Sequence, residues 1–194
     1  MSLELIVGPM FAGKTTELIR RQRRLQIIGR TVVVVNHASN IRDGCGAGEL
    51  QTHDLNRAQG SPVVPLDAIQ DLFIHPLYAR SDAIIVDEGQ FFWGLKNAVL
   101  RMVEHDGKHV VVAGLLARAD RSPFGQIHLL MLHADKVVFL RALCKRCGDG
   151  TPGLYTRKLR ETDTAIGGAD LYESLCRCHY LSVTREHQAL ASTQ

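Results

Sequence analysis

The sequence predicts an α/β fold with a parallel sheet, followed by a small second domain that binds zinc. Over the first 142 residues, short runs of β-branched residues alternate with helix-like segments. A phosphate-binding glycine motif follows the first of these runs, and four of the five cysteines lie between Cys144 and Cys178. The runs are apolar at every position, which is typical of strands that helices cover on both faces.

The predicted elements can be placed in order along the chain. Strands are expected at 3–7, 31–35, 83–86, 109–113 and 136–140, with helices at 15–28 and about 95–105. In the first helix, Leu18, Leu25 and Ile28 are spaced to form one buried face. Residues 38–65 are polar without a clear period, so we expect a loop or an irregular hairpin there. The composition changes near Leu143, which predicts a nucleotide-binding domain at 1–142 and a zinc-anchored domain at 143–194 with a frayed end after Val183.

Composition excludes several classes of protein. An apolar share of 45% and a charged share of 22% in 194 residues are typical of a globular protein with a buried core. No apolar run approaches the ~18 residues that a membrane-spanning helix needs, so no membrane partner is expected. A net charge of +3 is too small to indicate nucleic-acid binding. The first apolar run leads directly into the glycine motif and does not resemble a secretory signal, so we expect a cytoplasmic protein.

The glycine motif matches the P-loop pattern in full. Its residues are Gly8, Pro9, Met10, Phe11, Ala12, Gly13, Lys14 and Thr15, placed after a predicted strand and at the start of a predicted helix. Backbone N–H groups of such a loop surround phosphate oxygens, and the helix N-terminus adds partial positive charge. Lys14 is expected to reach the β- and γ-phosphates of a nucleotide, and the Thr15 hydroxyl is expected to bind Mg²⁺.

Two carboxylates follow the strand predicted at 83–86. Asp87 is expected to support Mg²⁺, and Glu88 is expected to act as a general base toward the attacking oxygen. If that oxygen belongs to water, the protein is an NTPase; if it belongs to a substrate hydroxyl, the protein is a kinase. Of the aromatic residues at 91–93, at least two are expected in the core, and one could stack on a base.

Two short Cys/His pairs have the spacing of a structural zinc site. Cys144 and Cys147 form C-x-x-C, and Cys176 and His179 form C-x-x-H, so the four could complete a tetrahedron. Cys178 is the alternative to His179 as the fourth ligand. A redox role for the first pair is the rival hypothesis, which the second pair makes less favourable. Cys45 is remote from the others and is expected to bind nothing.

Taken together, the motifs resemble those of type II, zinc-containing thymidine kinases. The motifs are the P-loop with Thr16-Glu17-Leu18, Thr52-His53-Asp54, Asp87 to Phe92, Pro123-Phe124-Gly125, Ile166 to Asp170 with Tyr172, and the two zinc pairs. The resemblance covers residues 2 to about 181. It implies a RecA-like domain with a zinc-anchored lasso that closes over the nucleoside. It also implies ATP, Mg²⁺ and structural Zn²⁺ as cofactors, deoxythymidine as the substrate, and a homotetramer.

The same resemblance implies roles for individual residues. Glu88 and Lys14 would be catalytic, with Glu88 taking the proton of the 5′-hydroxyl. The nucleotide would be bound by the P-loop together with Arg42, Asp87, Glu88, Gly89 and Gln90. The nucleoside would be bound by Met10, Glu88, Phe91, Leu115, Phe124, Thr156, Asp163, Thr164, Ala165, Ile166, Gly167 and Tyr172.

One segment departs from the family pattern. Family members usually carry Gly-Leu-Asp-Gly-x-Phe, whereas this chain has Leu116, Ala117 and Ala119 at the acid, the second glycine and the aromatic. This difference leaves two alternatives open beside the kinase. One is an NTPase in which Glu88 activates water, and the other is a nucleotide-binding regulator with altered nucleoside specificity.

Overall fold

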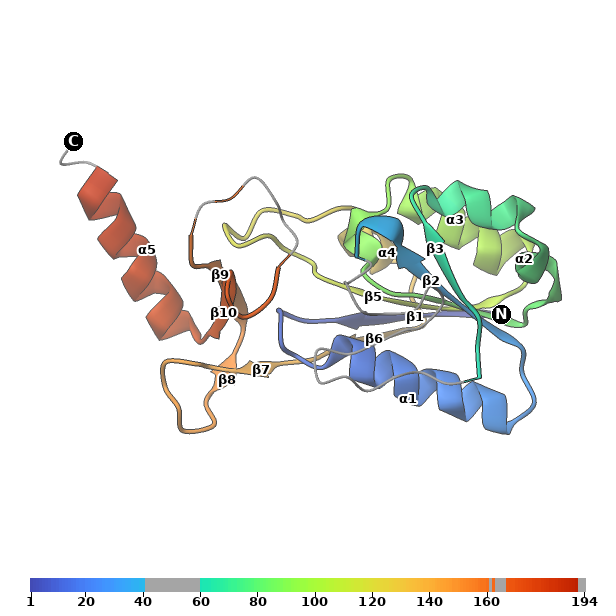
Figure 1. Cartoon of the computed structure of the whole chain (residues 1–194), viewed down its shortest axis with the longest axis horizontal. Coiled ribbons are helices and arrows are strands. Elements are labelled where there is room, and N and C mark those ends of the chain that lie inside the picture. Colours follow the sequence, from blue (N-terminus) through green and yellow to red (C-terminus); the bar gives the residue numbers. More distant parts are fainter. Residues whose placement is uncertain (41–59, 161, 163–166, 192–194) are drawn as a thin grey trace.

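The fold is a six-stranded parallel sheet between helices, with a smaller module beyond one end of the sheet (Figure 1). This computed structural model describes residues 1–40, 60–160, 162 and 167–191. The strand order is β3-β2-β4-β5-β1-β6, and every neighbouring pair is parallel. The bounds are β1 Ser2–Val7, α1 Lys14–Ile27, β2 Val32–His37, β3 Val63–Leu66, α2 Pro76–Arg80, β4 Ala83–Val86, α3 Leu95–Leu100, β5 His109–Gly114, α4 Ile127–Leu130 and β6 Lys136–Phe139.

Successive side chains of the central strands enter two different cores. In β4, Ile84 and Val86 pack with α3, whereas Ala83 and Ile85 pack with α1 on the other face. Figure 1 shows α1 on one side of the sheet and α2, α3 and α4 on the other. The expected two-sided burial is therefore confirmed, and it explains why these strands are apolar at every position.

The buried face of α1 differs from the predicted one. Leu18 is fully buried and Leu25 is partly buried, as expected, but Ile28 is 69% exposed and Ile19 is buried instead. Ile28 caps the C-terminus of the helix, where the chain turns through Gly29 toward β2. A residue at that turn projects beyond the sheet, so the helical period does not extend to it.

The segment predicted as a loop or hairpin contains a strand. Val63 and Val64 begin β3, which pairs in parallel with β2 at the edge of the sheet. The hairpin prediction is therefore wrong for these residues. Pro65 lies within β3 and masks the signal, because proline is excluded from central strands but tolerated at an edge. Residues 41–59, including Arg42 and Cys45, lie outside the described residues.

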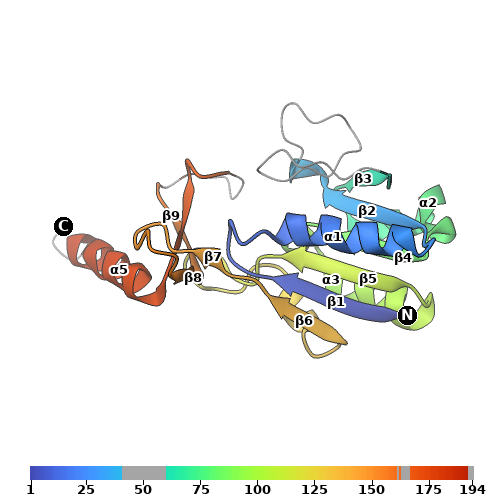
Figure 2. The same cartoon turned by 90° about the horizontal axis from the view of Figure 1, so that it is seen from below.

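A second, smaller module follows β6. It contains the short pair β7 (Ala142–Leu143) and β8 (Pro152–Gly153), the antiparallel pair β9 (Tyr155–Lys158) and β10 (Tyr172–Leu175), and helix α5 (Arg177–Ala191). Figure 2 shows that these elements extend from one end of the large sheet. They have a small core of their own, in which Leu175, Tyr180 and Val183 pack around Cys144.

The C-terminal segment after Val183, for which the sequence predicts fraying, continues α5 as far as Ala191. Among the described residues, no helix has the length and apolar character needed to cross a membrane.

Candidate active site and metal centre

The P-loop joins the end of β1 to the start of α1 at the edge of the sheet where the parallel strands end. Gly13 has a φ of +78° and begins the helix in the left-handed region, which glycine adopts without strain. Gly8 passes so close to the residue that follows β6 that a Cβ on it would lie 2.6 Å from the Leu140 carbonyl oxygen. The loop therefore has the form that its glycine spacing predicts.

Lys14 lies almost fully buried beneath this loop. Its Nζ donates a hydrogen bond to the Pro9 carbonyl oxygen at 2.8 Å, so the side chain curls back toward the loop. Burial lowers the pKa of Lys14, while the negative charges of Glu88 and Asp87 act in the opposite direction. A lysine held in this position is suited to bind an anion inside the loop.

Asp87 ends β4 opposite the first turn of α1. Its side chain is 3% exposed and accepts hydrogen bonds from the Thr15 hydroxyl at 3.1 Å and from the Glu88 backbone N–H at 2.9 Å. Burial, followed by the charge of Glu88, raises the pKa of Asp87 to about 7. A hydroxyl beside a carboxylate at this edge is the donor set that Mg²⁺ takes in nucleotide sites, so the residues fit the expected ion.

Glu88 is partly exposed and lies one residue farther along. It has a φ of 51°, and Gln90 Nε2 donates a hydrogen bond to its Oε2 at 2.5 Å. Gln90 itself is buried, and its Oε1 accepts a hydrogen bond from the Leu115 backbone N–H at 3.0 Å. The structure thus brings Lys14, Thr15, Asp87 and Glu88 to one edge of the sheet.

The three aromatic residues after Gln90 have different environments. Phe92 is in the core, Phe91 is half-buried, and Trp93 is 85% exposed. The expectation that at least two are core residues is therefore wrong, because the chain turns outward at Gly94, whose φ is +72°. The Phe91 ring packs edge-on against Phe124 at 5.4 Å between ring centres.

A cavity of about 750 Å³ lies between the sheet domain and the smaller module. Five of the residues expected to bind nucleoside line it: Met10, Leu115, Phe124, Thr156 and Tyr172. Phe91 packs against Phe124, but Phe91, Glu88 and Gly167 are not among the lining residues. Asp163, Thr164, Ala165 and Ile166 lie outside the described residues. The cavity also extends to Ala117 and Ala119, in the segment that departs from the family pattern. Three residues of α5, namely Tyr180, Val183 and Thr184, line it as well, and these the sequence does not predict.

Two hydrogen bonds join the smaller module to the walls of this cavity. The Met10 backbone N–H donates to Thr156 Oγ1 at 3.0 Å, so the P-loop is tied to β9. The Tyr180 hydroxyl donates to the Ala119 carbonyl oxygen at 2.7 Å. Both bonds connect residues more than 60 positions apart in the chain, which is why sequence spacing could not predict them.

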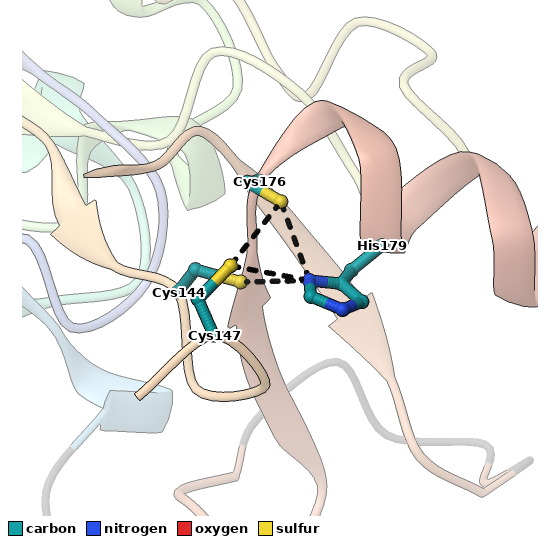
Figure 3. A group of neighbouring side chains, drawn as sticks. All are labelled: Cys144, Cys147, Cys176 and His179. Carbon is teal, nitrogen blue, oxygen red and sulfur yellow. Dashed lines mark hydrogen bonds between the residues drawn. The ribbon is translucent and has the colours of Figure 1, made fainter. Parts of the chain in front are cut away.

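The two Cys/His pairs converge as the sequence predicts (Figure 3). Cys144, Cys147, Cys176 and His179 place their ligand atoms within 4.8 Å of one another. The three sulfurs lie 3.3–3.5 Å from His179 Nδ1, and the sulfurs of Cys147 and Cys176 are 3.8 Å apart. Four ligands at ~2.0–2.3 Å from a common centre in a tetrahedron would be separated by about these distances, so the cluster fits zinc.

The structure favours His179 over Cys178 as the fourth ligand. Cys178 is exposed and does not belong to the cluster, whereas His179 directs its Nδ1 toward all three sulfurs. Burial opposes ionisation of Cys144, but backbone N–H groups of Cys176, Cys147 and Arg146 lower the pKa of its thiol to about 6. Burial and the hydrogen bonds with Cys144 and Cys176 raise the pKa of the Cys147 thiol to about 11, so the fit to a metal rests on the geometry of the four ligand atoms.

The chain was compared with known proteins. The thymidine kinase family model matches residues 1–180. A thymidine kinase from Oryza sativa subsp. japonica is 40% identical over 182 residues, and a cytosolic thymidine kinase from Gallus gallus is 39% identical over 181 residues. A thymidine kinase from Monkeypox virus is 38% identical over 185 residues.

Each alignment includes 92% of this chain. The chain spans 66% of the length of the Oryza sativa protein, 76% of the Gallus gallus protein and 96% of the Monkeypox virus protein. A solved DNA replication initiation factor overlaps 72% of this chain and 40% of its own, with a TM-score of 0.43 and 13% identity, which is too weak to support an argument. The family model and the relatives agree over nearly the whole chain, and the chain therefore belongs to the thymidine kinase family.

Proposed function

We propose that this protein transfers the γ-phosphoryl group of ATP to the 5′-hydroxyl of deoxythymidine, giving dTMP and ADP. Family membership supports ATP and thymidine as the substrates. The observation that carries the proposal is the meeting of the buried P-loop lysine with two carboxylates at one edge of the sheet, next to the 750 Å³ cavity.

In the proposed reaction, Glu88 accepts the proton of the 5′-hydroxyl. The resulting oxygen attacks the γ-phosphorus in line with the bond to the β-phosphate oxygen, and that bond breaks to release ADP. Lys14 and the backbone N–H groups of the P-loop bind the phosphate oxygens, whose negative charge shifts during transfer. Thr15 and Asp87 would hold Mg²⁺, which when bound neutralises charge on the phosphates.

The nucleoside would occupy the cavity on the side of Met10, Phe124 and Thr156. These side chains, with Leu115 and Tyr172, supply apolar walls and two hydroxyl groups, which is typical of a pocket for a flat, partly polar ligand. The Phe124 ring is held at the cavity wall by its T-shaped contact with Phe91 and by the Arg118 guanidinium, which lies 4.4 Å from the ring centre. We also propose that Arg42 lies on the nucleotide side and that residues 163–167 contribute to the lid over the nucleoside.

Product analysis tests this function directly. The purified chain, incubated with ATP, Mg²⁺ and thymidine, is expected to form dTMP and ADP in equal amounts, with ADP release dependent on thymidine. ADP release at the same rate without thymidine would identify an NTPase. ATP binding with no transfer to any nucleoside in a panel would identify a regulator.

A separate substitution tests whether Glu88 is the general base. Glu88→Gln keeps the size of the side chain but cannot accept a proton, so kcat is expected to fall by about 10²- to 10⁴-fold. The KM for ATP should change little, because the P-loop is intact. A Glu88→Gln variant with nearly full activity would contradict this role.

Three further features are proposed, the first two from the family and the third from the change in composition near Leu143. They are a homotetrameric assembly, a cytoplasmic location, in line with the cytosolic relatives from Gallus gallus and Bos taurus, and a division into domains at residues 142 and 143. Sedimentation at several protein concentrations would test the assembly, with a mass of about four chains expected.

A further inference from the structure

The side-chain amide of Gln90 is engaged at both ends. Its Nε2 donates to Glu88 Oε2 at 2.5 Å, and its Oε1 accepts from the Leu115 backbone N–H at 3.0 Å. Among the residues that the structure describes, no other hydrogen bond is recorded to the Glu88 carboxylate. Leu115 lines the cavity, so one amide connects the carboxylate to the cavity wall.

These two partners allow only one orientation of the amide. A half-turn would bring Oε1 against the carboxylate of Glu88 and would direct the NH₂ group at the N–H of Leu115. Both hydrogen bonds would then be lost in a site where Gln90 is only 3% exposed to water. The NH₂ group of Gln90 is therefore directed at Glu88.

The surrounding backbone packs closely against Gln90 at two glycines. A Cβ on Gly114 would lie 2.2 Å from Gln90 Oε1, and a Cβ on Gly125 would lie 2.2 Å from the Gln90 carbonyl oxygen. Two glycines thus allow β5 and the segment after Phe124 to close around this residue. Such packing restricts side-chain rotamers, which is a requirement for holding a reacting group in place.

We propose that Gln90 is a positioning residue, which holds the Glu88 carboxylate toward the reacting hydroxyl and ties that orientation to the cavity wall at Leu115. The inference rests on the proposed function, because Glu88 must be the base. Gln90 acts through Glu88 and through the cavity wall at Leu115. It therefore affects turnover without contacting the nucleoside.

Two substitutions separate the two contacts. Gln90→Met has a similar length but loses both hydrogen bonds, whereas Gln90→Glu keeps the oxygen that accepts from Leu115 and, as a carboxylate, cannot donate to Glu88. Gln126→Met is the matched control, because Gln126 Oε1 also accepts a backbone N–H, that of Lys96 at 3.1 Å, without contacting Glu88. Circular dichroism and thermal unfolding would establish that each variant folds.

We expect both Gln90 variants to lower kcat by about 10-fold or more, within the range of general acid–base effects, and to leave the KM for ATP within about twofold. Gln126→Met should keep kcat within about twofold of the wild type. In a Glu88→Gln background, Gln90→Glu should lower kcat by less than about twofold, because the group that Gln90 holds can no longer act.

Three outcomes would overturn the proposal. Gln90→Glu could retain wild-type kcat, it could lower kcat equally in both backgrounds, or Gln90→Met could match Gln126→Met. If the wild-type chain forms no dTMP, or if Glu88→Gln alone is fully active, the proposed function fails first and this inference fails with it. These results are distinguishable because they appear in proteins with Gln90 intact.

Discussion

The Thr15 hydroxyl donates a hydrogen bond to Asp87 Oδ2 at 3.1 Å, which joins the first turn of α1 to the end of β4. The two residues are 72 positions apart in the chain. The bond places a hydroxyl and a buried carboxylate where a divalent cation between protein and phosphates would need them. Burial of the Asp87 carboxylate also destabilises the folded protein when no nucleotide or magnesium is bound.

Asp87→Asn should stabilise the protein in the absence of nucleotide and magnesium while abolishing phosphoryl transfer. Because the folded-state pKa of about 7 is above the ordinary value for aspartate, ionised Asp87 destabilises the fold. The contribution of Asp87 to the free energy of unfolding of the wild type should therefore decrease as pH rises from about 4 to 7. At pH 8 the variant should gain about 1–3 kcal/mol, measured by urea unfolding.

The gain should be smaller at pH 5.5, where Asp87 is largely protonated in the folded wild type. An equal gain at both pH values would show that burial of the charge is not its cause.

Lys14→Met should remove activity without unfolding the protein. Methionine can occupy the same buried space beneath the P-loop but carries no charge, so kcat/KM should fall by at least about 100-fold. Lys145→Met is a suitable control, since Lys145 lies in the second module and changes the net charge equally. Thymidine-dependent ADP release measures both. Activity of the Lys14 variant near that of the control would contradict the nucleotide assignment.

Zinc binding should depend on Cys176 and not on its neighbour Cys178. Cys176→Ser removes a ligand from the cluster, whereas Cys178→Ser changes an exposed thiol that does not belong to it. Atomic emission should detect about one zinc per chain in the wild type and in the Cys178 variant, and much less in the Cys176 variant. The reverse result would identify Cys178 as the ligand.

Ala119→Phe should narrow the nucleoside range. Ala119 lies on the cavity wall between Phe124 and α5, and a phenyl ring there would fill part of the 750 Å³. Nucleosides with bulky apolar groups on the base should lose about 10-fold or more in kcat/KM relative to thymidine. If every nucleoside is affected equally, the space near Ala119 does not receive the base.

Leu18 and Ile28 should contribute very differently to the stability of the fold. Leu18→Ala opens a cavity between α1 and the sheet and should cost about 2–5 kcal/mol, whereas Ile28→Ala changes a side chain that is 69% exposed and should cost less than about 0.5 kcal/mol. Urea unfolding of the two variants provides the comparison. Similar losses would mean that α1 extends its buried face through Ile28.

The central strands and the zinc cluster were predictable because their signals are local. A strand buried on both faces is apolar at every position, and Cys144 and Cys147 are spaced to grip one edge of a tetrahedron. The spacing favoured His179 as the fourth ligand, which the structure bears out, but left Cys178 open, because the choice depends on which side of the first turn of α5 faces the loop after β7.

Residues with long-range partners were predicted less well. Strand β3 is short and contains Pro65, so only its pairing with β2 identifies it. For Gln90, sequence resemblance suggests a place near the nucleotide, but the partners Glu88 and Leu115 become visible only when β4 and β5 are side by side. The wall formed by α5 could not be predicted, because it depends on the packing of two modules.

The hydrogen bond from Tyr180 to the Ala119 carbonyl connects the Cys/His cluster to the cavity wall. Tyr180 directly follows His179, so an ion that fixes the histidine also fixes the tyrosine and the segment that the tyrosine holds. A protein depleted of zinc would therefore lose selectivity among nucleosides at mild temperatures, before any loss of secondary structure.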